Sequence, residues 1–159
     1  GKIYMANTAA VPKSFRVELL NGIHAFGTSV VRAGTGADTF KMALYLATAT
    51  INADTTAYTG TGELAATGNY TAGGVTLTNA TAPANTGGTG IVAFWTPSAA
   101  ATWTALTSSG SFDCALIYNS TQSNKAVGVF TFGAQNVTAG NFTINMPTND
   151  LTTGLIRIS

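Results

Sequence analysis

FKMALYLA at residues 40–47 alternates large apolar side chains with lysine, alanine and tyrosine. Successive side chains of a β-strand point to opposite faces, so every second residue of this stretch falls on the same face. The four residues that share the apolar face are Phe40, Met42, Leu44 and Leu46. The stretch therefore predicts a strand with one face in a hydrophobic core.

The same kind of pattern recurs along the rest of the chain. Short runs rich in β-branched and aromatic residues follow at 75–78, 91–95, 112–118, 126–132, 142–146 and 155–158. Clusters of glycine, asparagine and serine separate them, as is typical of turns between strands. Together with residues 40–47 they predict seven strands. The fold class that we expect is all-β, a single-domain β-sandwich or jelly-roll with one short N-terminal helix.

The expected helix covers about residues 13–21. Pro12 precedes this stretch and Gly22 follows it, which is the usual punctuation of a helix start and a helix end. Phe15 and Leu19 are spaced to share one face, so packing of that face would hold the short helix in place. We therefore predict an N-terminal extension at residues 1–12 and one domain at residues 13–159.

The composition indicates a protein that assembles. Charged residues make up only 8% of the 159 residues, against roughly 25% in an average soluble domain. Such a chain covers its surface with threonine, serine, asparagine and alanine, or with neighbouring molecules. Scattered bases and a net charge of +1 argue against direct nucleic-acid binding. No apolar run approaches the length of a membrane span, so we expect no membrane partner.

Residues with chemical reactivity are few. His24 is the only histidine, and it lies apart from cysteines and carboxylates, so a structural role is favoured over a metal ligand. Cys114 lies in an apolar run and is expected to be a small buried thiol. The six carboxylates are isolated from one another in the sequence. We therefore predict no catalytic, cofactor-binding or metal-binding residues, and no enzyme activity.

Four residues are the candidates for an interface: Glu63, Tyr70, Trp95 and Trp103. Glu63 lies among glycines, where its carboxylate could accept backbone N–H groups or an arginine from another subunit. The two tryptophans favour core or interface anchors over stacking on a carbohydrate.

Several segments resemble small structural proteins of tailed-phage virions. The resemblance begins with FRVELLNGIH at residues 15–24 and DTFKMALY at residues 38–45. It continues through TTAYT at 55–59, GEL at 62–64, GNYTAGGVTL at 68–77, ALIYN at 115–119 and KAV at 125–127. It thus extends from about residue 13 almost to the end of the chain.

This resemblance implies a virion protein that is assembled in the cytoplasm of a bacterial host. Within that family, we expect a capsid decoration or cement protein that contacts the major capsid protein and copies of itself, with a trimer as one arrangement of the copies. The alternative is a tail or head-fibre component that binds a host receptor.

Overall fold

The computed structural model describes residues 7–20, 22–26, 37–78, 82–85 and 92–159. Within these residues the chain forms one helix and eight strands. They are α1 (Lys13–Leu20), β1 (Phe40–Leu46), β2 (Val75–Thr76), β3 (Ala93–Trp95), β4 (Ala101–Leu106), β5 (Phe112–Asn119), β6 (Lys125–Gln135), β7 (Gly140–Ile144) and β8 (Ile156–Ile158). All strand pairs are antiparallel, which confirms the all-β class.

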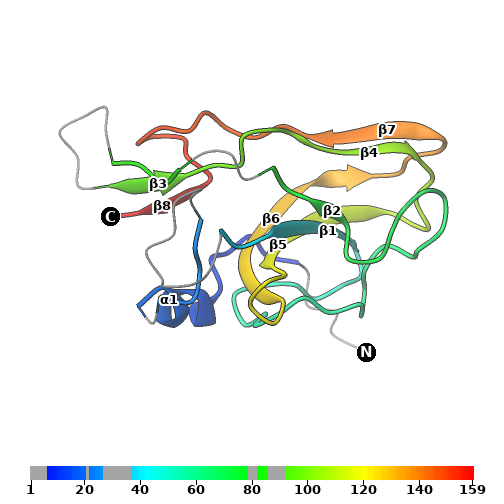
Figure 1. Cartoon of the computed structure of the whole chain (residues 1–159). Coiled ribbons are helices and arrows are strands. Elements are labelled where there is room, and N and C mark those ends of the chain that lie inside the picture. The colour runs from blue at the N-terminus through cyan, green and yellow to red at the C-terminus, as the bar shows by residue number, and fades with distance from the viewer. Residues whose placement is uncertain (1–6, 21, 27–36, 79–81, 86–91) are drawn as a thin grey trace.

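The strands form one sheet and two ribbons. The sheet has four strands in the order β2-β1-β5-β6, and the ribbons are β3–β8 and β4–β7. The β4–β7 ribbon lies over one face of the sheet, and α1 lies near the opposite face (Figure 1). This layering has the character of a sandwich. It differs from the jelly-roll alternative, which would pair two four-stranded sheets.

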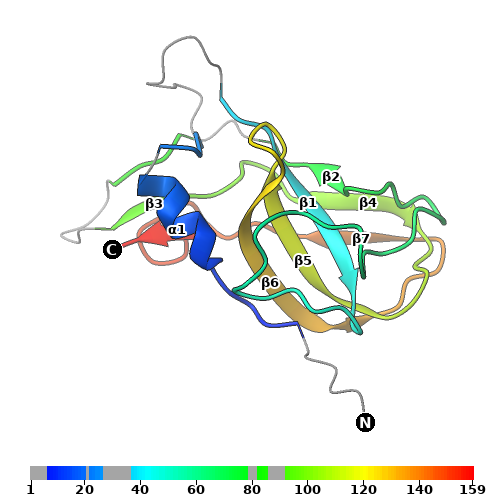
Figure 2. The same cartoon turned by 90° about the horizontal axis from the view of Figure 1, so that it is seen from below.

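The central strands β1 and β5 are buried on both faces. On the face toward the β4–β7 ribbon, Phe40, Met42 and Leu44 join a large apolar cluster, as the alternation predicted. On the opposite face, Ala43 and Tyr45 join a second, smaller cluster. The irregular segment between β1 and β2 covers this second face (Figure 2).

Strand β4 is the strand that the sequence pattern missed. Its residues Ala101, Trp103 and Leu106 are buried, whereas Thr102 and Thr104 face outward. The strand pairs with β7 through Trp103 and Phe142. Its inward face contains an alanine where a larger residue would have made the alternation clear.

The helix lies where the sequence predicted it, apart from its last residue, Asn21, which falls outside the described residues. Its end is closed by a Schellman motif, in which the Gly22 and Ile23 N–H groups donate to the Leu19 and Glu18 carbonyls. Gly22 adopts φ 65°, a conformation that glycine reaches without strain.

Residues 7–12, the described part of the predicted extension, lie against the domain. Ala10 and Val129 of β6 exchange two backbone hydrogen bonds of 3.1 and 2.9 Å. The Asn7 amide donates to Asp113, and its carbonyl oxygen accepts from the Ile51 N–H. This part of the N-terminal segment therefore covers the outer edge of β6 at Val129.

Candidate functional site

All four predicted interface residues lie inside the chain. Glu63 is 9% exposed, Tyr70 4%, Trp95 2% and Trp103 3%. Their side chains therefore offer little surface to a partner within the described chain, and for the two tryptophans this agrees with the core position that the sequence left open beside an interface. The reason is that the layers of the fold close over them.

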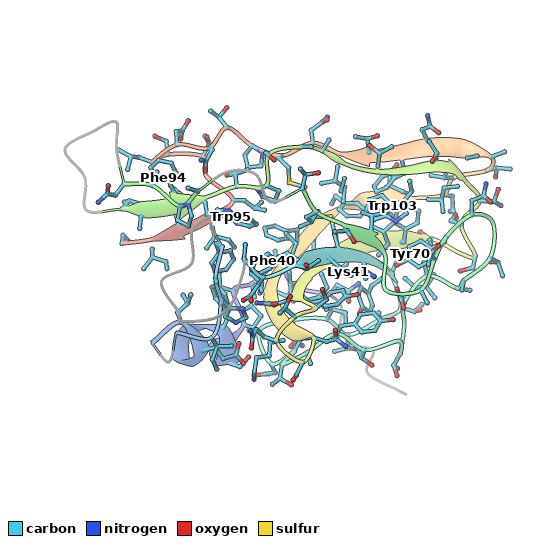
Figure 3. All side chains as sticks on the ribbon, viewed as in Figure 1. Phe40, Lys41, Tyr70, Phe94, Trp95 and Trp103 are labelled. Atoms are coloured by element: carbon cyan, nitrogen blue, oxygen red, sulfur yellow. The ribbon has the colours of Figure 1, made fainter. Side chains whose placement is uncertain are left out.

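The two tryptophans are core anchors. Trp95 packs against Phe26 and Phe40, with ring centroids 4.9 and 5.4 Å away. Trp103 points from β4 toward the four-stranded sheet and packs against Phe142 (Figure 3). Neither indole ring offers a free face on which a sugar could stack.

Glu63 is the centre of a buried hydrogen-bond cluster. Its Oε2 accepts the Tyr58 hydroxyl at 2.6 Å, and its Oε1 accepts the Tyr70 hydroxyl at 2.7 Å. The Gly73 N–H also donates to Oε1, at 2.7 Å. The prediction that Glu63 accepts a backbone N–H is thus confirmed, whereas the two tyrosines were not foreseen.

The tyrosines of this cluster stay protonated. Burial raises the pKa of Tyr58 and Tyr70, and their hydrogen bonds to Glu63 raise it further. Burial also raises the pKa of Tyr118 to about 12, and its hydroxyl donates to the Gly73 carbonyl at 2.8 Å. Each hydroxyl is therefore a hydrogen-bond donor. The cluster holds residues 58–73 against the face of the sheet that carries Ala43 and Tyr45.

A second buried polar cluster joins α1 to the β5–β6 turn. The Asn119 side-chain amide donates to His24 Nδ1 at 3.0 Å and to Asp38 Oδ2 at 2.8 Å. Because Nδ1 accepts a hydrogen bond, the proton of a neutral His24 lies on Nε2, which donates to Glu18 at 2.8 Å. Lys125 Nζ pairs with the other Glu18 oxygen at 3.1 Å.

This cluster occupies both nitrogens of His24. The ring therefore has no nitrogen left to accept a proton from a nucleophile or to bind a metal ion. Among the described residues, no group of three or more histidine, cysteine or carboxylate side chains could hold a metal ion. The same part of the chain has no helix with the length and apolarity needed to cross a membrane.

The stability of the chain is expected to fall as the pH drops below the ordinary pKa of histidine, 6.5. Burial lowers the pKa of His24 from its ordinary 6.5, although Glu18 and Asp38 pull it upward and Lys125 pulls it down. Below pH 6.5, His24 of the unfolded chain binds a proton more readily than His24 of the folded chain does. The free energy of unfolding therefore decreases as the pH falls below 6.5. Urea unfolding at several pH values measures this effect. His24→Gln should flatten the curve in this window, and an equal slope in both proteins would contradict the assignment.

Cys114 is expected to resist thiol reagents in the folded chain. Burial raises the pKa of its thiol from 9.0 to about 12, and its exposed fraction is 0%. Only the thiolate is nucleophilic, so we expect labelling at least about a hundredfold slower than in the unfolded chain. A maleimide or disulfide reagent with and without denaturant measures the two rates. Equal rates would show that this part of the sheet opens readily.

Two long stretches of the chain contain no charged residue. No Asp, Glu, Lys or Arg occurs at residues 64–112 or 126–149, which include all of β2, β3, β4 and β7. We call the outward face of the β4–β7 ribbon the uncharged layer. It consists of Thr102, Thr104, Asn141, Thr143 and Asn145, all exposed.

The uncharged layer is the candidate contact surface. Thr102 and Thr143 lie opposite each other, and their hydroxyls form a hydrogen bond of 3.1 Å across the ribbon. Two long stretches without charge were a visible signal in the sequence, but only the fold shows that one strand from each, β4 and β7, pair in one ribbon. Comparisons of the chain with protein-family models, with curated proteins and with solved structures gave no match.

Proposed function

We propose that this chain is a non-enzymatic structural protein of a tailed-phage virion. In this proposal it decorates and stabilises the capsid by contacting the major capsid protein and other copies of itself. The proposal continues the sequence resemblance, and the fold adds one observation in its favour.

That observation is the uncharged layer. An isolated domain usually covers its sheets with lysine and glutamate, which repel other copies of the same chain. Here the exposed side chains of the ribbon are threonine, asparagine and one alanine, Ala105. Such a face can contact a neighbouring subunit without burying a charge. Burial of an unpaired charge carries a large desolvation penalty, which would weaken the interface.

The engagement of the reactive residues supports the non-enzymatic part of the proposal. Both nitrogens of His24 and both carboxylate oxygens of Glu63 already hold structural hydrogen bonds. The Cys114 thiol is buried, and its pKa lies far above neutral pH. Each of these groups would have to leave its partners or its burial before it could act on a substrate.

One structural feature supports the alternative, which is a tail or head-fibre protein that binds a host receptor. An open groove of about 390 Å³ lies between the β3–β4 connection and the residues after β7. Its lining is uncharged and includes Ser98, Asn145 and Pro147. The buried tryptophans supply no aromatic platform for a glycan in this groove, so the alternative ranks second.

The experiment is a count of copies in purified virions. A decoration protein predicts a molar ratio to the major capsid protein near one or near a simple fraction of it, by quantitative mass spectrometry. Particles that lack the protein should release their genome at lower temperature or under milder osmotic shock. A few copies per particle, with heads of unchanged stability, would instead favour the receptor-binding alternative.

A further inference from the structure

Strand β7 forms one edge of its ribbon. It pairs with β4 and with no other strand of the described chain. On its other side, the described residues supply no backbone hydrogen bond to Gly140–Ile144. By contrast, Ala10 covers part of the edge of β6.

The usual protections of an edge strand are missing from β7. Natural sheet proteins shield such edges with charged residues, proline, or a β-bulge that twists the strand away. Strand β7 has the sequence GNFTI, without charge or proline. The irregularity of the ribbon lies in β4, where two residues separate the paired positions Trp103 and Leu106 and Ala105 adopts φ 49°. The edge of β7 therefore remains regular and able to accept another strand.

We propose that β7 pairs antiparallel with β7 of a second copy of this chain, about a twofold axis. The absence of charge is the argument for a second copy of this chain as the partner. A basic or acidic partner would find no complementary charge on this strand, whereas an uncharged strand is compatible with itself. Identical strands pair antiparallel in a closed, self-complementary contact, which is the commonest symmetry of homo-oligomers.

The pairing joins two ribbons into one sheet in the order β4-β7-β7-β4. The uncharged layers of both copies then form one continuous outer face. A contact of a few residues buries less area than a stable interface needs, so the dimer is weak in dilute solution. Repetition over a shell multiplies such contacts. The inference deepens the proposed function, and rests on it for the statement that copies meet on a virion.

Charges introduced on the β7 side of the ribbon test the pairing in the purified chain. Thr143→Lys/Asn145→Lys and Thr143→Glu/Asn145→Glu each place like charges along both copies of the strand. Neither side chain is buried, so the fold should persist. Sedimentation velocity over a range of concentrations should show a wild-type dimer, and a dimer constant at least about tenfold weaker in each variant. Mixing the two variants should restore the dimer, whatever the register of the pair.

The matched control is Thr102→Lys/Thr104→Lys. It adds the same charge to the same face, but on β4, which lies away from the contact in the order β4-β7-β7-β4, so the dimer should persist. A wild-type chain that stays monomeric up to about 1 mM would overturn the proposal. So would a trimer that the Thr143 and Asn145 variants leave intact, or a mixture of the two variants that stays monomeric.

Hydrogen exchange of the wild-type chain gives a second test, which needs no variant. Amides of residues 140–145 should exchange more slowly as the concentration rises through the range of dimer formation. Unchanged exchange there, alongside a dimer, would place the contact elsewhere. These results are independent of the copy number in virions, so a failed pairing and a failed virion assignment give different outcomes.

Discussion

Replacement of Glu63 by alanine is expected to lower the free energy of unfolding by about 4 kcal/mol. The change removes the acceptor of three donors, namely the Tyr58 and Tyr70 hydroxyls and the Gly73 N–H. Hydrogen bonds to a charged group are worth roughly 1.5–3 kcal/mol each, and a buried donor left without a partner costs its desolvation. Urea unfolding followed by tyrosine and tryptophan fluorescence measures the loss.

Two further variants calibrate this result. Glu63→Gln keeps the length and one carbonyl acceptor, so we expect about half the loss. Asp54→Asn removes an equal charge from an exposed side chain and should change stability by less than about 0.5 kcal/mol. A loss below about 1 kcal/mol for Glu63→Ala would show that the cluster contributes little to the fold.

Gly74→Ala is expected to destabilise the chain by about 3 kcal/mol or more. Gly74 adopts φ 72°, and a Cβ atom there would overlap the Met42 carbonyl oxygen of β1. That oxygen belongs to the backbone of a central strand, so it cannot move aside without disturbing the pairing of β1. The midpoint of thermal or urea unfolding measures the loss.

Gly60→Ala is the matched control for this position. A Cβ atom at Gly60 meets nothing within 4 Å, and its φ is not in the left-handed region. The variant should therefore stay within about 0.5 kcal/mol of the wild type. Equal stability of Gly74→Ala and Gly60→Ala would mean that the turn before β2 is looser than the structure shows.

The sequence predicted the central strand well but only one of its two buried faces. The face with Phe40, Met42 and Leu44 has large apolar residues at every second position, which is a strong signal. The other face has Ala43 and Tyr45, which suit water or a core equally well. Its burial depends on the segment after β1, whose path is irregular and has no periodic pattern to identify it.

The two polar clusters show where prediction from the sequence ends. Glu63 and Gly73 were separately visible in glycine-containing segments, yet Gly73 lies ten positions after Glu63 along an irregular stretch of chain. Asn119 lies 95 residues from His24, and no pattern in either segment predicts the contact. Their pairing results from how β5, α1 and the connecting segments pack. The structural role that we predicted for His24 agrees with its two hydrogen bonds. For the two tryptophans, the sequence left a core and an interface position open, and only the packed layers show that both are in the core.

The proposal that this chain decorates a virion is tested most directly by a map of the intact particle at residue resolution. We predict this fold on the capsid shell in many copies, with the β4–β7 ribbon against a neighbouring copy and other surfaces against the major capsid protein. A shell map without this chain, or one that places it only at the tail, would contradict the proposal.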